Sequence, residues 1–370
     1  MTKYPYHRQT DIRNQSFLIP PSNPINYKIG STYPLIDQPN ITLSYPNVLS
    51  AYTYLPKQPR LGSHTYFRSI GWPQYLINDL LNGKQIIIPS MLIDRIRRKP
   101  PLFSVDYAWF SALTFFGCSG HGYTHPNQSC SYKQIRSSRN RYHNLLNKDI
   151  DDQSLVLIPG VLKQVQLFEQ DVSSHKVIAN SHSEYIILIA SNDLNLGFEK
   201  LESLKWSSMK HGFNIIHKMA ANNTKQAISR LISGPSHAKH ITIINLMDLG
   251  LTPYAYRNFL LRWFAHIITL NYNRQLQKLV SSIRLQHPAV SIHIFSMFNL
   301  TKKLSQQAYF NATLGEQCNS NRAYLGANSP KLNCHINHKH AYLYWDEYHL
   351  TSLYYQSFAY HLKQFLVKHS

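Results

Sequence analysis

Two polar residues inside an aromatic run have the types and the spacing of a catalytic pair. Asp346 and His349 lie three positions apart in YWDEYHLTSLYYQ, residues 344–356. A carboxylate can accept a hydrogen bond from one imidazole nitrogen and leave the other nitrogen free to take a proton from a hydroxyl nucleophile. The spacing alone is a weak signal, because Asp and His are also common near helix starts. The pair predicts acid–base chemistry only in the company of other residues.

A second candidate group follows an aliphatic run. The segment EYIILIASND, residues 184–193, predicts a buried strand with Ser191, Asn192 and Asp193 at its carboxyl end. An Asn amide in such a place can donate to a developing oxyanion, a contact that typically stabilises the transition state by about 3 to 4 kcal/mol. The alternative interpretation is that these three residues cap and begin the next helix.

The elements that must position these residues alternate between strand and helix. Apolar runs in 184–193, 240–250 and 289–298 predict strands. The segment 155–170 combines a short apolar run with a helix, and 253–287 is a long amphipathic helical pattern. Such alternation predicts an α/β fold with a central, mostly parallel sheet covered on both faces by helices, and function at the carboxyl ends of the strands.

The length and composition of the chain suit one large domain. It has 370 residues, of which 43% are hydrophobic. Residues 1–24 read as an irregular N-terminal extension, and residues 25–370 as a single domain. Within the Pro- and Asn-rich first part, 25–30 predicts a brief strand and 72–83 a helix with Pro in its first turn.

The charge of the chain is strongly basic. Lys and Arg number 38 against 18 Asp and Glu, which gives a formal net charge of +20 and an attraction to anionic surfaces. The basic residues are scattered and form no recognisable nucleic-acid module, so we expect no nucleic-acid partner. No run of about 18 uninterrupted apolar residues occurs, so we also expect no transmembrane segment.

The four cysteines lie at the ends of two polar segments. Cys118 and Cys130 enclose one, and Cys318 and Cys334 enclose the other. Sequential pairing would close two short loops, each stabilising the fold by about 3 kcal/mol. The alternative is four free thiols in a reducing cytosol, and zinc is disfavoured because the short Cys-x₂₋₄-Cys spacing is missing. Disulfides predict an extracytoplasmic or secreted protein, although the opening residues lack the apolar region of a secretory signal.

Four segments in order carry a resemblance to a known family. They are VDYAWFSALT (105–114), IASNDL (189–194), NLMDLGLTP (245–253) and YWDEYHLTSLYYQSFA (344–359). These resemble the second block, the third block, a strand-and-turn, and the fifth block of the GDSL branch of the SGNH hydrolases. Within that branch the chain is most similar to the bacterial thermolabile-hemolysin and glycerophospholipid–cholesterol acyltransferase group, which also has a cysteine-bracketed loop before the last block.

The resemblance implies a fold, an activity and roles for individual residues. The fold would be a three-layer α/β sandwich of the SGNH type. Asn192 would match the oxyanion-hole Asn, and Asp346 and His349 the catalytic Asp and His. The activity would be ester hydrolysis of the phospholipase A or lysophospholipase kind, or acyl transfer, on acyl-ester lipids at an anionic membrane surface. This chemistry needs no metal and no organic cofactor.

The sequence also departs from the family pattern. The G-D-S-L-S-D string of the first block is missing, and by position KIGSTYPLIDQPN (28–40) is its candidate. Thr32 would then replace the nucleophilic Ser, with Ser31 as the alternative nucleophile. Phe110 stands where the family has the Gly whose backbone N–H completes the oxyanion hole. Ala190 replaces the Gly of the third block, and Leu350 the Pro of the fifth.

Two hypotheses of different class therefore remain. The first is a working ester hydrolase with a substituted nucleophile. The second is a catalytically impaired or inactive homologue that keeps the fold and serves as a lipid- or protein-binding module.

Overall fold

The computed structural model describes a large part of the chain. The described residues are 76, 88–89, 105–106, 113–114, 116–119, 129–131, 134, 157–194, 212, 215–307, 314–317, 342–344, 347–350 and 352–369. The expected strand at 25–30 lies outside them. Of the expected helix at 72–83, Leu76 is described, and it is helical and buried.

A parallel three-stranded sheet forms the centre of the described structure. Strands β5 (Glu184–Leu188), β6 (His240–Ile244) and β7 (Ser291–Phe295) lie in the order β5-β6-β7. The three predicted strands are thus confirmed, because each aliphatic run pairs along its whole length. Leu188 pairs with Ile244, and Ile244 pairs with Phe295, so the strands end level with one another. Their carboxyl ends therefore form one edge.

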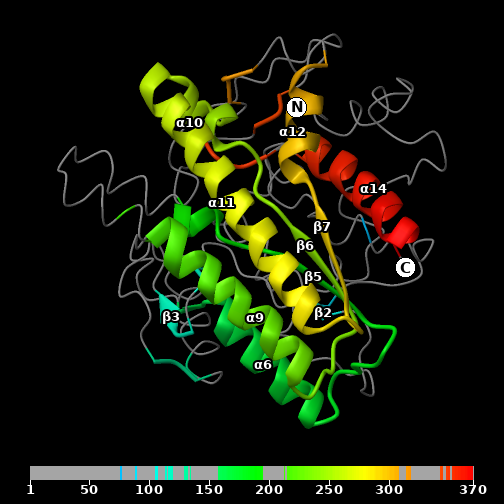
Figure 1. Cartoon of the computed structure of the whole chain (residues 1–370). Coiled ribbons are helices and arrows are strands. Elements are labelled where there is room, and N and C mark those ends of the chain that lie inside the picture. The colour runs from blue at the N-terminus through cyan, green and yellow to red at the C-terminus, as the bar shows by residue number, and fades with distance from the viewer. Residues whose placement is uncertain are drawn as a thin grey trace, which may run out of the picture.

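Helices flank this sheet, as Figure 1 shows. They are α6 (Val161–Ser173), α9 (Ala221–Ser233), α10 (Pro253–Tyr256), α11 (Phe259–Gln286), α12 (Met297–Ser305) and α14 (Ser352–His369). A π-helical segment, η4 (Ile215–Ala220), leads into α9, and a 3₁₀ turn, η5 (Leu249–Leu251), precedes α10. The parallel sheet with flanking helices confirms the α/β class. None of the helices in the described part is both long enough and apolar enough to cross a membrane.

The long amphipathic segment at 253–287 is two helices and not one. Helix α10 begins at Pro253, where Thr252 accepts a hydrogen bond from the backbone N–H of Ala255. The chain then turns at Asn258, whose side chain accepts from the N–H groups of Leu260 and Leu261. An Asn in this capping position satisfies the free amides of a new helix start. The break at Asn258 therefore begins α11.

Two hydrophobic clusters cover the two faces of the sheet. Ile243 of β6 and Ile292 of β7 belong to the cluster that contains the buried residues of α9 and α11. Phe295 of β7 belongs to the second cluster, together with Phe358 of α14. Side chains alternate between faces along a strand, so a strand whose two faces are both covered reads as a continuous apolar run. This explains the unbroken aliphatic pattern of the strands.

Two further strand pairs and a disulfide join the described pieces before residue 160. Strand β1 (Ile88–Pro89) pairs in parallel with β2 (Val105–Asp106), and β3 (Cys118–Ser119) pairs antiparallel with β4 (Ile158–Pro159). Cys118 and Cys130 form a disulfide, which confirms the first predicted pairing. The second predicted pair, Cys318 and Cys334, lies outside the described residues.

Candidate functional site

The turn after β5 carries the first group of candidate residues. Ala190 ends the strand region with φ of +85°, a backbone conformation that favours Gly, and its side chain is fully buried. Residues 191–194 then form a helical turn, and partly buried Asn192 lies on it. Strained backbone of this kind persists only where the surroundings hold it, and it is common at functional sites.

Asp193 ties this turn to a distant segment. It is fully buried and accepts hydrogen bonds from both the backbone N–H of Thr114, at 3.1 Å, and the Thr114 hydroxyl, at 2.7 Å. Asn223 of α9 in turn donates to the Thr114 hydroxyl at 3.0 Å. Burial raises the pKa of the Asp193 carboxyl to about 7, although the Thr114 hydrogen bonds oppose that rise. The IASNDL segment is thus fixed against the end of VDYAWFSALT.

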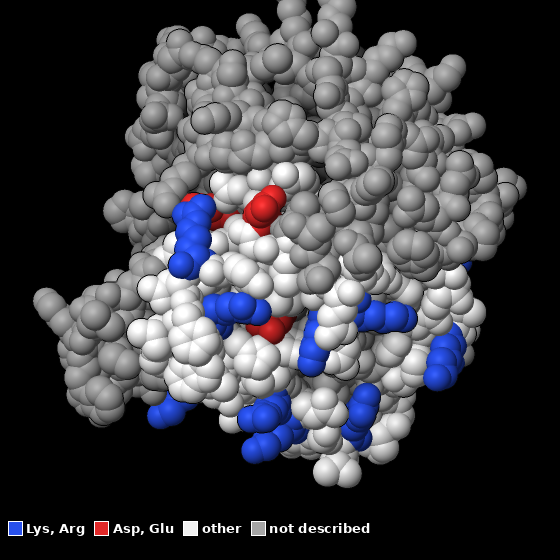
Figure 2. Space-filling view, turned by 90° about the horizontal axis from the view of Figure 1, so that it is seen from above, with Lys and Arg blue, Asp and Glu red and all other residues white. Residues whose placement is uncertain are grey.

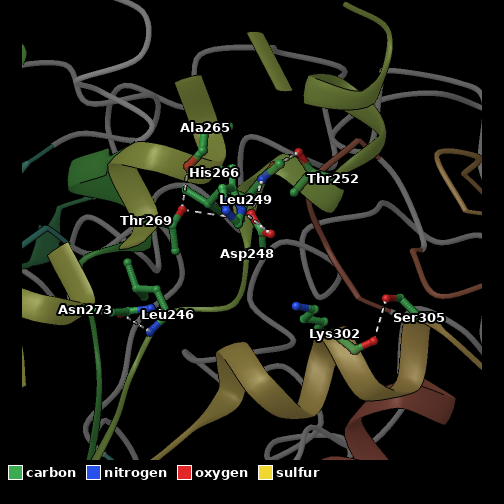
Figure 3. Close-up of polar contacts among 11 residues, drawn as sticks. Leu246, Asp248, Leu249, Thr252, Ala265, His266, Thr269, Asn273, Lys302 and Ser305 are labelled. Carbon is green, nitrogen blue, oxygen red and sulfur yellow. Dashed lines mark hydrogen bonds and ion pairs between the residues drawn. The ribbon is translucent and has the colours of Figure 1, made fainter. Parts of the chain in front are cut away.

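The turn after β6 is held by side-chain amides. The Asn245 side chain accepts from the backbone N–H of Phe298 at 3.1 Å, which joins the turn to α12. Asn273 of α11 bonds both backbone groups of Leu246, accepting at 3.0 Å and donating at 2.9 Å. Thr269, one turn earlier on α11, accepts from the N–H of Leu249. These contacts, several of them visible in Figure 3, fix the course of the chain as it leaves the sheet.

An Asp–His pair lies at the same turn. Asp248 accepts from the N–H of Gly250 at 2.9 Å through one carboxylate oxygen, and its other oxygen is 2.7 Å from Nδ1 of His266 on α11. The two side chains meet between the turn and the helix in Figure 3. A Cβ at Gly250 would lie 2.8 Å from the carbonyl oxygen of Arg262, so only Gly permits this close approach. The pair has the geometry of an imidazole oriented by a carboxylate.

The segment that contains His349 packs on α10. The Glu347 carbonyl accepts from the N–H of Tyr254 at 3.2 Å, and the Glu347 carboxylate is 2.7 Å from Nη1 of Arg257. The Tyr254 and Tyr348 rings lie 4.9 Å apart between centroids. His349 follows directly and is partly buried. Because α10 comes immediately after the turn of β6, this segment is anchored to the carboxyl edge of the sheet.

Two of the predicted catalytic and oxyanion residues, Asn192 and His349, are among the described residues. Asn192 lies on the turn after β5. His349 lies on the segment that packs on α10, and α10 follows β6, the strand next to β5 in the sheet. Thr32, Ser31, Phe110 and Asp346 lie outside the described residues. Those residues that the structure describes include no group of three His, Cys, Asp or Glu side chains that could hold a metal ion.

No model of a known protein family matches this chain, and no curated protein matches it either.

Sequence reasoning missed two features of the site. The Thr114–Asp193 contact joins residues 79 positions apart, and the Asp248–His266 pair joins residues 18 apart. A signal for the second was present, because Asp248 lies in the turn after a strand and His266 interrupts an apolar stretch of the following helix. The sequence does not show how α11 crosses the turn, and that crossing brings His266 to Asp248.

Proposed function

We propose that the chain is an SGNH-type hydrolase with a three-layer α/β sandwich fold, acting on the acyl esters of lipids. Asn192 would donate to the oxyanion together with the backbone N–H of Phe110. His349, oriented by Asp346, would be the base. The nucleophile would be the hydroxyl of Thr32, with Ser31 as its alternative.

The observation that supports this proposal is the convergence of segments at one sheet edge. Asn192 follows β5, and the His349 segment packs on the helix that follows β6. The order of these segments along the chain is that of the resemblance. In α/β folds, ligands bind at the carboxyl ends of the strands. The Cys118–Cys130 disulfide supports an extracytoplasmic location, where such bonds persist.

The reaction that this arrangement suits is acyl transfer in two halves. The nucleophilic hydroxyl gives its proton to His349 as its oxygen bonds to the acyl carbonyl carbon. The tetrahedral oxyanion, held by N–H donors, collapses, and His349 returns the proton to the departing alcohol. Water, activated by the same imidazole, then releases the acid, whereas an alcohol in place of water would give acyl transfer.

Labelling with a fluorophosphonate tests the proposal, because that reagent needs an activated hydroxyl. The wild-type protein should be labelled, H349A and N192A should lose most labelling, and mass spectrometry should place the label at Thr32 or Ser31. H266A is the matched control, since His266 is also an imidazole paired with a carboxylate at this edge. If H266A loses labelling while H349A keeps it, the base is assigned to the wrong histidine.

A second candidate function is that of a binding module that retains this fold without turnover. Ala190 favours it, because a buried Ala at a φ of +85° occupies the place where the resembled family has Gly. The missing G-D-S-L string favours it as well. A folded wild-type protein that binds lipid but takes no fluorophosphonate label would support the module and reject the hydrolase.

A further inference from the structure

The first turns of α11 expose large apolar side chains. Phe259 is 78% exposed, Leu260 62% and Trp263 51%. Phe259, Trp263 and His266 are spaced at i, i+4 and i+7, so they share one helix face. Apolar side chains that gather on a surface in this way mark binding sites far more often than isolated ones do. We call Phe259, Leu260 and Trp263 the apolar tip.

Two arginines, Arg257 and Arg262, lie beside the apolar tip. The first turn of α11 contains no acidic residue. The Arg262 guanidinium lies 4.0 Å above the Tyr256 ring, and Arg257 precedes the helix cap. Two carboxylates near these arginines are paired, Glu347 with Arg257 and Asp248 with His266. On the face seen in Figure 2, Lys and Arg side chains are spread across the described residues, and a few Asp and Glu side chains lie among them.

The apolar tip lies at the same end of the molecule as the carboxyl ends of the strands. In Figure 1, α10 and the start of α11 lie at the same end as α12, which directly follows the carboxyl end of β7. The face that begins at Phe259 continues to His266, and His266 contacts Asp248 on the turn after β6. A surface that the tip enters would therefore lie beside the candidate site.

We propose that the apolar tip docks the protein on anionic phospholipid bilayers. Trp and Phe enter the interfacial region of a bilayer, and neighbouring Arg side chains are attracted by its negative surface potential. The inference rests on the proposed function for its choice of a lipid partner. It adds the element that meets the lipid and the orientation in which the sheet edge faces it.

Vesicle binding tests this docking. The full chain is sedimented with vesicles of phosphatidylcholine and phosphatidylglycerol, as wild type and as the triple variant F259S/L260S/W263S. Loss of three apolar anchors should lower the partition coefficient by about tenfold or more. L285S is the matched control, because Leu285 is 85% exposed at the other end of the same helix. It should bind as the wild type does.

Three results would overturn the proposal. They are a wild type that does not bind these vesicles, a triple variant that binds as well as wild type, and a triple variant whose only change is from dimer to monomer in analytical ultracentrifugation. The last result would assign the tip to a second copy of the chain. Matching far-ultraviolet spectra and melting temperatures establish that all variants fold.

Hydrolysis of a water-soluble short-chain ester separates this proposal from the proposed function. The triple variant should keep the wild-type rate on that ester while losing vesicle binding. A wild type that binds vesicles but hydrolyses no ester would reject the hydrolase and leave the docking surface standing.

Discussion

At the scale of single residues, Ala190 adopts a backbone conformation that residues with a Cβ disfavour. Its φ of +85° suits Gly, and the side chain is fully buried. We expect A190G to leave the free energy of unfolding unchanged or raise it by up to about 1 kcal/mol, because relief of strain offsets the greater flexibility of the unfolded chain. Urea denaturation measures this. The control is A227G in α9, a buried helical Ala, which should destabilise by about 1 kcal/mol or more. Equal losses in both variants would mean that Ala190 is not strained.

Asp193 makes stability depend on pH. Its folded-state pKa of about 7 lies above the ordinary value of 3.8 because of burial, so the folded protein holds a proton that the unfolded chain releases. The stabilising effect of that proton is complete below about pH 4 and is lost as the pH rises to about 7. We expect the stability of wild type relative to D193N to fall by roughly 4 kcal/mol at most over this range. Denaturant titrations at several pH values measure the difference, and a constant difference would contradict the raised pKa.

At the scale of elements, a histidine pair joins the end of α14 to β7. The His293 and His369 rings lie 4.5 Å apart between centroids, and the His293 ring is 2.7 Å from the Ser291 hydroxyl. Burial lowers the pKa of His293, and the charges of His369, Arg284 and His240 lower it further. Protonation of His293 is therefore less favourable in the folded protein than in the unfolded chain.

The lowered pKa of His293 predicts a loss of stability in acid. Because the folded pKa of His293 lies below the ordinary 6.5, its contribution is present above that pH and is lost as the pH falls through 6.5 toward the folded value. We expect wild type to lose more stability than H293Q between pH 7.5 and about 5.5. Chemical denaturation at both pH values provides the measurement. Equal losses in the two proteins would show that the acid sensitivity arises elsewhere.

At the scale of the whole molecule, the Cys118–Cys130 bridge closes a loop at strand β3. Cys118 lies in β3, which pairs with β4 just before α6. Closing a loop of this length reduces the freedom of the unfolded chain, so C118S/C130S should lower the free energy of unfolding by about 3 kcal/mol. Thermal denaturation of both proteins tests this. Peptide mapping without reductant should recover the bridge in wild type, and a free thiol at either position would contradict it.

The sheet could be read from the sequence because its signal is local. The aliphatic runs of β5, β6 and β7 are each followed by small or polar residues, and burial on both faces explains why they do not alternate. The Asp248–His266 pair could not be read in this way. It depends on the crossing of α11 over a turn, which Asn258, Thr269 and Asn273 set through hydrogen bonds to the backbone. The crossing therefore depends on several weak contacts, some of them between residues far apart in the sequence, and no local pattern predicts these.

The candidate site residues were also chosen from local signals. The resemblance singles out Asn192 and His349 one by one, since a short motif surrounds each of them. In the resembled family the residue at position 190 is Gly, and Ala190 has a positive φ, which favours Gly. The Thr114–Asp193 contact that fixes the Asn192 turn has no motif of its own, because it forms only once the two segments are folded together.

Helix α14 has a consequence for how the protein is made. The strands β5, β6 and β7 are neighbours both in the sheet and along the chain, so they can pair as they leave the ribosome. Phe358 and Leu362 of α14, which cover the second face of that sheet, follow more than fifty residues after β7. During that interval of synthesis the second face has its contacts from α12, such as Leu300 and Leu304, but lacks those of Phe358 and Leu362. Chains that stop before residue 352 would leave the part of that face that α14 covers exposed, and quality-control proteases and chaperones should recognise them as unfinished.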